Sequence, residues 1–332
     1  MKEIFELIKK LTFGKIANYV KLNISYFFYF YFKGKNIKGL PYSLSVEPTN
    51  ICNLNCLQCP TGQKILNRDT GNLKTETFNE IIKQNKKNLL TLILYFQGEP
   101  FIASKIYDFI NIASKNNIYT ITSTNGHYLS KENCKKIIKS GLNKLIISLD
   151  GTSQTEYEKY RQNGDFNKVI SGIKNIIEVK KNLKSKLPVI ELQFLVFRHN
   201  QHQIKDFFNL AKQLKVDKYK LKTAQIYDLK KDYNLIPTIS KYSRYVKDEN
   251  GNYKIKSKLK NNCYRMWTSS VITWDGDVVP CCFDKDAKYK LGNINTHNFK
   301  QIWNNTKYYK FRDSIKNNRA KIDICQNCTQ GL

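Results

Sequence analysis

The feature that most constrains the fold of this 332-residue chain is an alternation of short apolar segments with amphipathic ones between residues 42 and 223. The apolar segments are rich in Ile, Leu, Val, Tyr and Thr, as buried parallel strands are. They cover residues 43–47, 92–97, 119–124, 144–149, 189–196 and 218–222. Segments with helical periodicity lie between them, at residues 75–88, 105–117, 131–140, 167–183 and 204–214. Repeated strand–helix units of this kind predict a parallel sheet with right-handed crossovers.

The predicted fold class is therefore α/β. Six strands favour a partial (β/α)6 barrel of the TIM type over the closed eight-stranded barrel. A doubly wound open sheet is the alternative, and periodicity does not separate the two. Ser130 and Thr75 are predicted helix N-caps, and Gly141 is a predicted stop at the C-terminal end of a helix.

Polar or glycine-rich sequence follows the ends of five predicted strands. These positions are residues 52–59, 98–100, 125–126 and 150–151, and Arg198. Because the carboxyl ends of barrel strands form the active-site face of such folds, we expect these positions to share one site.

Three cysteines lie within eight residues directly after the first predicted strand. Cys52, Cys56 and Cys59 have the spacing C-x3-C-x2-C, which lets three thiolates reach one metal centre from a single loop. A structural zinc site or a four-iron cluster normally takes four ligands, and the sequence offers no fourth Cys or His nearby. Three ligands leave one metal position open, which suits a catalytic centre. A zinc site completed from far away, or a chance third cysteine, is the alternative.

The remaining cysteines form a second group near the C-terminus, with Cys134 isolated. Residues 224–262 are charged, Tyr-rich and weakly periodic, and we interpret them as a connector. Residues 270–273 and 278–282 then predict a hairpin, and residues 299–304 and 308–317 predict short helices. Nine cysteines in two tight groups favour metal binding over a disulfide framework.

The chain carries 56 Lys and Arg against 27 Asp and Glu, a net charge of +29. This excess of positive charge makes a zinc-stabilised basic protein that binds nucleic acid an alternative. However, the lysines are spread along the whole chain and arginine is sparse, so a nucleic-acid partner is not expected. An acidic protein partner, such as an electron donor, would be attracted by this surface.

The N-terminal residues contain no signal-peptide pattern, and a cytoplasmic location is expected. The aromatic run at residues 26–32 is too short to span a bilayer. Lys21, Lys33 and Lys35 flank it, so residues 16–35 could lie on a membrane surface; packing against the rest of the protein is the alternative.

Between residues 42 and 328 the chain resembles the radical S-adenosylmethionine (SAM) superfamily with a C-terminal SPASM or twitch-type domain. The resemblance rests on the cysteine triad and the second cysteine group, together with the segments 97–100 (QGEP), 123–126 (STNG) and 148–151 (SLDG), in that order. It implies an N-terminal basic and aromatic extension at 1–40, a barrel at 41–223, a connector at 224–262 and an iron–sulfur domain at 263–332.

The resemblance implies that Cys52, Cys56 and Cys59 hold a [4Fe–4S] cluster whose open iron chelates SAM. Reductive cleavage of SAM would then give a 5′-deoxyadenosyl radical that abstracts hydrogen from a substrate. The implied SAM contacts are Gln97, Gly98 and Glu99 for the amino group, Ser148 and Arg161 for the carboxylate, and Asn125 for the ribose or the local turn. An ordinary turn at 98–100 and a surface role for Arg161 are the alternatives. Two positions depart from the family pattern, since Gln97 replaces a glycine and Gln58 an aromatic residue.

By the same resemblance, four thiolates hold an auxiliary [4Fe–4S] cluster: Cys263, Cys281, Cys325 and Cys328. Cys282 is expected to pack or to replace Cys281, Cys134 is expected to be buried packing, and zinc is the alternative metal. In relatives such a cluster transfers electrons or shapes the substrate pocket, which favours an oxidation.

The electron donor would be an acidic protein such as flavodoxin or ferredoxin. Substrates of two classes remain open: a peptide or protein to be matured, and a carbohydrate to be dehydrogenated. No catalytic residue is identified. Asp275, Asp277 and Asp284 are candidate bases only because they lie near the auxiliary ligands in sequence.

Overall fold

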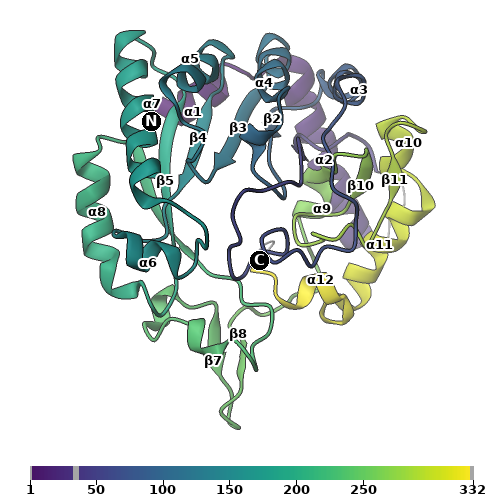
Figure 1. Cartoon of the computed structure of the whole chain (residues 1–332). Coiled ribbons are helices and arrows are strands. Elements are labelled where there is room, and N and C mark those ends of the chain that lie inside the picture. Colours follow the sequence, from purple (N-terminus) through teal and green to yellow (C-terminus); the bar gives the residue numbers. More distant parts are fainter. Residues whose placement is uncertain (1, 33–36, 330–332) are drawn as a thin grey trace. The chain divides into compact units, whose positions relative to one another are not determined.

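A computed structural model of the chain describes residues 2–32 and 37–329 (Figure 1). The chain divides into two compact units, and each is described here by itself. The first unit contains residues 1–51, 66–121 and 259–332, and the second contains residues 52–65 and 122–258.

The strands of the first unit follow the order β11-β10-β9-β1-β2-β3. Strand β1 (Ser43–Val46) pairs in parallel with β2 (Thr91–Ile93) on one side and β9 (Ser269–Ile272) on the other. Strand β2 pairs in parallel with β3 (Tyr119–Thr124), whose first three residues belong to this unit. Strands β10 (Asp277–Val279) and β11 (Gly292–Asn293) continue beyond β9 in antiparallel pairs.

Helices from three parts of the chain complete the first unit. Helices α1 (Lys2–Ile8) and α2 (Phe13–Phe32) precede the first strand, and α3 (Thr75–Asn85) and α4 (Ile106–Lys115) alternate with the next two strands. The C-terminal segment adds α9 (Arg265–Thr268), α10 (Phe299–Trp303), α11 (Thr306–Asn318) and α12 (Asp323–Gln326). Phe78 of α3 stacks on Phe109 of α4 with ring centroids 4.4 Å apart, and both rings are fully buried.

The second unit has three parallel strands in the order β4-β5-β6. They are β4 (Lys144–Ser148), β5 (Val189–Val196) and β6 (Lys218–Thr223). Its helices are α5 (Lys131–Lys139), α6 (Gln154–Glu158), α7 (Phe166–Asn182) and α8 (Ile204–Gln213). A separate antiparallel hairpin, β7 (Tyr245–Lys247) and β8 (Tyr253–Ile255), lies in the segment predicted as a connector.

Local signals explain several element boundaries. Ser130 caps α5, since its hydroxyl accepts the backbone N–H of Asn133 at 3.2 Å. Gly141 has φ +82°, the left-handed conformation that ends a helix most readily when no Cβ is present. The prediction that Thr75 is an N-cap is wrong. The extended cap residue is Lys74, and Thr75 is already the first residue inside α3.

The six predicted strands and the five helices between them are confirmed to within a few residues. The C-terminal hairpin and short helices are also confirmed. The sequence reading missed α2, a helix of 20 residues, because its aromatic residues hide a helical spacing of polar ones. Lys33 and Lys35 of the predicted membrane segment lie outside the described residues.

Candidate active site

The loop that carries the three N-terminal cysteines is hydrogen-bonded to the segment after α6. The backbone N–H of Asn55 donates to the Gln162 carbonyl at 3.1 Å, and that of Leu57 donates to the Tyr160 carbonyl at 3.2 Å. Gly62 follows the triad, and a Cβ there would lie 2.6 Å from the Cys56 nitrogen. Only glycine therefore lets the chain turn back over Cys56, a requirement that sequence reasoning missed.

The three thiols are close enough to influence one another. Burial raises the pKa of the Cys56 thiol to about 12, Arg161 opposes this rise, and Cys59 and Cys52 add to it. A buried thiol of this kind loses its proton only when a strong interaction stabilises the thiolate, and binding to a metal cluster would be such an interaction, with release of the proton. The donor set therefore fits an iron–sulfur cluster.

Arg161 lies between the cysteine loop and a buried carboxylate. Its guanidinium Nε and terminal nitrogen donate to Asp150 Oδ2 at 2.7 and 2.6 Å, and another terminal nitrogen lies 3.9 Å from Cys56 Sγ. The other oxygen of Asp150 accepts the backbone N–H of Leu195 at 2.6 Å. The alternative of a plain surface arginine does not describe this residue, whose side chain is only 16% exposed. Ser148 is half-buried at the end of β4 in the same unit.

Asn125 is positioned beside the cysteine loop by a histidine that sequence reasoning missed. The Asn125 amide nitrogen donates to Asn53 Oδ1 at 2.8 Å and lies 4.0 Å from Cys52 Sγ. His127 Nδ1 lies 3.0 Å from Asn125 Oδ1, and His127 Nε2 accepts the backbone N–H of Asp165 at 2.9 Å. Because Nε2 accepts, the ring proton belongs on Nδ1, where it is donated to Asn125.

The predicted SAM residues at 97–99 belong to the first unit and form a tight, buried turn. The Glu99 N–H donates to the Ile51 carbonyl at 2.8 Å, and its carboxylate accepts the Phe101 N–H at 3.2 Å. Gly98 has φ +73°, and a Cβ there would lie 2.6 and 2.7 Å from the carbonyl oxygens of Thr49 and Ile51. Because those neighbours are backbone atoms that cannot move aside, the position requires glycine.

A buried ion pair at the end of β1 is a further feature that sequence reasoning missed. The Arg68 guanidinium donates to both oxygens of Glu47 at 2.6 Å, and the Trp274 N–H donates to the same carboxylate at 3.2 Å. Burial raises the pKa of Glu47, and the hydrogen bonds from Arg68 oppose that rise. The available signal was a glutamate directly after an apolar strand.

The C-terminal thiols are gathered within the first unit. Cys282, Cys325 and Cys263 each raise the pKa of Cys281, in addition to the larger effect of its burial. Two arginines accompany these thiols. Arg319 donates to Cys328 Sγ at 3.3 Å and to the Asn262 carbonyl at 2.9 Å, and the nearby thiols, first of all Cys282, raise the pKa of Arg265. Soft thiolates beside cations are a donor set that fits an iron–sulfur cluster.

The remaining two cysteines and the three candidate bases pack or hydrogen-bond within the fold. Cys134 is fully buried in α5, and Cys282 packs against the small apolar cluster of Val271, Val279 and Ala287. Each of the three carboxylates has a partner nearby in the chain: Asp275 accepts the Thr273 hydroxyl, Asp277 pairs with Lys290 at 2.6 Å, and Asp284 accepts the N–H groups of Lys288 and Tyr289. Among the described residues, no three His, Cys, Asp or Glu side chains are gathered as a single metal ion requires.

Gln58, where the family pattern has an aromatic residue, fastens the cysteine loop to the segment after β6. Its amide nitrogen donates to Asp232 Oδ2 at 3.0 Å, and its amide oxygen accepts the Tyr227 N–H at 3.1 Å. Both partners lie in the segment that sequence reasoning treated as a connector. The cysteine loop and this segment therefore form one hydrogen-bonded assembly within the second unit.

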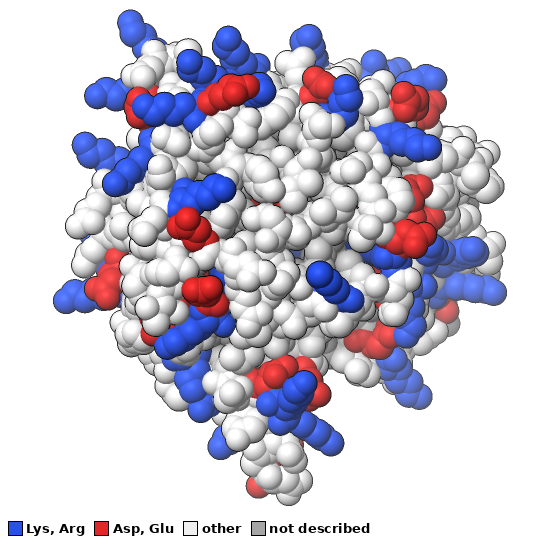
Figure 2. All heavy atoms as spheres, in the orientation of Figure 1, with Lys and Arg blue, Asp and Glu red and all other residues white. Residues whose placement is uncertain are grey.

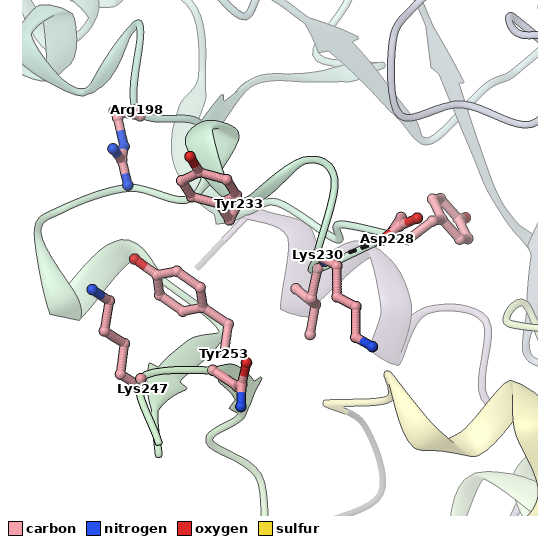
Figure 3. A pocket seen from close by; sticks show the side chains of 10 residues that line it. Arg198, Asp228, Lys230, Tyr233, Lys247 and Tyr253 are labelled. Carbon is pink, nitrogen blue, oxygen red and sulfur yellow. Dashed lines mark hydrogen bonds between the residues drawn. The ribbon is translucent and has the colours of Figure 1, made fainter. Parts of the chain in front are cut away.

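The same segment lines an open cavity of about 920 Å³ in the second unit (Figure 3). Arg198, which follows β5, directs its guanidinium toward the cavity while its Nε donates to the Ile236 carbonyl at 2.9 Å. Tyr253 and Lys247 come from the β7–β8 hairpin, with the lysine nitrogen 5.6 Å from the tyrosine ring centre. The other charged and aromatic lining residues are Tyr227, Asp228, Lys230 and Tyr233. The cavity thus combines three cations, one carboxylate and three tyrosines.

On the face drawn in Figure 2, positive charge does not gather into one stripe. Figure 2 shows Lys and Arg side chains spread over the visible face and interspersed with Asp and Glu. This distribution agrees with a globally basic composition and gives no support to a dedicated nucleic-acid groove on that face.

Comparison with known proteins identifies two regions. A model of the radical SAM superfamily matches residues 46–217, and a model of the SPASM iron–sulfur cluster-binding domain matches residues 263–329. These matches agree with the predicted resemblance, with the two cysteine groups and with iron–sulfur clusters and SAM as cofactors.

Among curated proteins, the chain is 28% identical over 172 residues to the GTP 3′,8-cyclase of Clostridium botulinum strain Hall, covering 51% of this chain and 52% of that protein. The chain thus spans about half the length of the cyclases that it matches. It is 24% identical over 319 residues to the tungsten-containing aldehyde ferredoxin oxidoreductase cofactor-modifying protein of Pyrococcus furiosus, covering 86% of each.

Among solved structures, Streptococcus suis SuiB bound to SAM superposes with a TM-score of 0.64 at 18% identity, covering 90% of this chain and 75% of SuiB. That likeness supports the fold. Together with the family match it confirms the predicted α/β fold class of partial-barrel type, with a C-terminal SPASM region.

Proposed function

Because this chain belongs to the radical SAM superfamily, we propose that it reductively cleaves SAM and uses the resulting 5′-deoxyadenosyl radical to oxidise a substrate. The observation that carries the proposal is the buried Cys56 thiol, which lies with two further thiols beside Arg161 and Asn125. Relatives with similar sequences are enzymes. We therefore favour an enzyme over a zinc-stabilised nucleic-acid-binding protein.

The proposed site residues divide between ligands of the cluster and contacts to SAM. We propose that Cys52, Cys56 and Cys59 hold the catalytic [4Fe–4S] cluster, and that the Arg161–Asp150 pair presents a guanidinium face toward the SAM carboxylate. Asn125, oriented by His127, offers its amide beside the cluster loop. Gln97, Gly98, Glu99 and Ser148 complete the proposed SAM contacts.

We further propose that Cys263, Cys281, Cys325 and Cys328 hold an auxiliary [4Fe–4S] cluster. The chain would then divide into an extension at 1–40, the barrel at 41–223, a connector at 224–262 and the auxiliary domain at 263–332. Arg319 and Arg265 would stabilise the negative charge of the thiolates. A cluster with four protein ligands suits acceptance of the electron that a substrate radical loses together with a proton, which makes the net reaction a two-electron oxidation.

The cavity after β6 supports a substrate class. Arg198, Lys247 and Lys230 favour an anionic group, and tyrosine side chains offer flat faces and hydroxyl groups to a sugar ring. We therefore propose an anionic carbohydrate, such as a sugar phosphate, as the substrate class. A peptide is the competing class.

The first experiment is anaerobic reconstitution of the full chain with iron and sulfide. We expect about eight irons per chain from two four-iron clusters, and 5′-deoxyadenosine from SAM after reduction. Cys56→Ala should abolish SAM cleavage and retain about four irons, whereas Cys325→Ala should lose the other cluster. Cys282→Ala is the matched control and should retain both clusters. Zinc without iron, or intact SAM after full reconstitution, contradicts the proposal.

The substrate class is tested by isotope transfer. A sugar phosphate with deuterium at its ring carbons should label the 5′-deoxyadenosine, and Arg198→Gln should lower this labelling by about tenfold or more without lowering SAM cleavage in the absence of substrate. Label from a deuterated peptide alone would establish the competing class.

A further inference from the structure

Helix α2 buries a stripe of mostly polar side chains, which reverses the usual arrangement of a surface helix. Its buried residues are spaced three and four apart and thus form one stripe, made of Lys15, Asn18, Leu22, Ser25 and Tyr29. Four of these five side chains carry polar groups. A surface helix of a globular protein normally places such groups in solvent and its apolar residues in the core.

Hydrogen bonds fix this orientation. Asn18 exchanges two bonds with the Leu40 backbone, both at 2.8 Å, and Ser25 donates to the Lys38 carbonyl at 2.9 Å. The Lys15 ammonium donates to the backbone carbonyl of Asn117 at 2.6 Å. Rotation of the helix about its axis would break these bonds and leave buried polar groups unsatisfied, at a cost of about 1–3 kcal/mol for each group.

The opposite side of α2 is apolar and exposed, and the preceding helix α1 also exposes apolar side chains. Of the 21 large hydrophobic side chains that are exposed among the described residues, 13 lie between Ile4 and Phe32. We call these 13 side chains the N-terminal apolar face. On α2 they include Phe13, which is 88% exposed, and Ile16, Val20, Ile24, Phe27 and Phe28; on α1 they include Ile4, Phe5 and Ile8. Exposed apolar side chains concentrated in one part of the chain in this way mark an interaction site.

The charge around this face points to the chemistry of its partner. The sequence from residue 7 to residue 46 contains no Asp or Glu and seven lysines. The acids of α1 are Glu3 and Glu6, and Glu6 is paired with Lys9 at 2.7 Å. Helix α2 carries no Asp or Glu, and its exposed aromatic and aliphatic side chains with lysines before and after them are the pattern of a helix that lies in the interface of an anionic bilayer. None of the described helices combines the length and apolarity that crossing a bilayer requires.

We propose that α1 and α2 bind the surface of an anionic lipid bilayer, with the N-terminal apolar face inserted among the lipid headgroups. The inward hydrogen bonds hold the face in place before binding, so association needs no prior unfolding or rotation of α2. Phe27 contacts Phe28, Tyr31 and Phe32 through ring centroids between 4.7 and 6.1 Å, and this aromatic group would sit at the headgroup level.

Sedimentation of the full reconstituted chain with vesicles tests the proposal without reference to catalysis. We expect binding to vesicles made of equal parts phosphatidylcholine and phosphatidylglycerol, weaker binding to phosphatidylcholine alone, and loss of the difference at high salt. The double substitution Phe27→Asn with Phe28→Asn should lower the partition coefficient on the order of 100-fold, since each buried phenyl group contributes roughly tenfold. The matched control, Leu183→Asn with Ile239→Asn, removes two exposed side chains elsewhere and should bind like the original chain.

Circular dichroism and iron content should be the same for all variants, which shows that folding is intact. Failure of the original chain to bind anionic vesicles overturns the proposal, and so does unchanged binding of the Phe27/Phe28 double variant. A dimer in the absence of lipid that this variant converts to a monomer would also overturn it, because a second copy of the chain would then cover the apolar face.

Discussion

At the scale of single residues, the candidate site depends on side chains that orient other side chains. His127 orients Asn125, which in turn approaches Cys52 and Asn53. Burial lowers the pKa of His127, with the Asn125 backbone opposing, and its Nε2 can accept the Asp165 N–H only while the ring is neutral. The folded state therefore prefers the neutral imidazole.

This preference predicts a pH dependence of stability. The pKa of His127 is lower in the folded state than the ordinary value of about 6.5, so the unfolded chain binds more protons over the window between the two values. The free energy of unfolding should fall as the pH drops below about 6.5, by at most about 1.4 kcal/mol per pH unit for this one group. Burial also lowers the pKa of His199, so this residue changes the stability with pH in the same direction.

Urea unfolding at several pH values measures this effect. His127→Gln should flatten the acid limb of the stability profile, whereas His297→Gln changes an exposed histidine and should leave the profile as it was. An unchanged acid limb in His127→Gln would show that the neutral ring does not contribute.

At the scale of elements, the sequence predicted strands better than it predicted the contacts that hold the site. The strand–helix alternation gave β5 with both ends correct, because a buried strand has a strong apolar signature. Nothing in the sequence pairs Glu47 with Arg68, or His127 with Asp165, since such contacts depend on how distant segments meet. Gly98 lies in the segment 97–100 and Gly62 lies just after the cysteine triad, but the close backbone contacts that require glycine at both positions become visible only in three dimensions.

The segment after β6 shows the same limit. The polar composition of this segment predicted a connector. In the structure, Gln58 of the cysteine loop is hydrogen-bonded to Tyr227 and Asp232 of the segment. Gln58→Leu removes both hydrogen bonds, which are worth roughly 0.5–1.5 kcal/mol each. Amide hydrogen exchange over residues 227–235 should accelerate by about tenfold or more, as local opening becomes easier.

The matched control for that substitution is Gln213→Leu, which changes an exposed glutamine at the end of α8. It should leave exchange over residues 227–235 as it is in the original chain. Equal exchange in both variants would show that the Gln58 contacts do not hold the segment.

At the scale of the whole molecule, charge governs encounters with partners. The net charge of +29 is spread over the surface with no single dominant patch on the face in Figure 2. Such a surface attracts an acidic protein over a distance set by salt, with a screening length of about 10 Å at 0.1 M.

Reduction by an acidic donor protein should therefore slow on the order of tenfold when ionic strength rises from low values to above physiological ones. Stopped-flow absorbance of the iron–sulfur clusters measures the rate. A small uncharged photoreductant serves as the control and should show little salt dependence. A donor rate that is insensitive to salt would exclude electrostatic steering of this encounter.

The pairing of β1 has a consequence for the order in which the protein can be made. Strand β1 pairs with β2 at one edge. At its other edge it pairs with β9, in which Ser269 is the partner of Ser43. At roughly 5–20 residues per second, a ribosome needs on the order of 10–45 s to reach that partner after β1 emerges. Until then the apolar strand with Leu44 and Val46 has an edge without its native partner, and such an edge can pair with other strands.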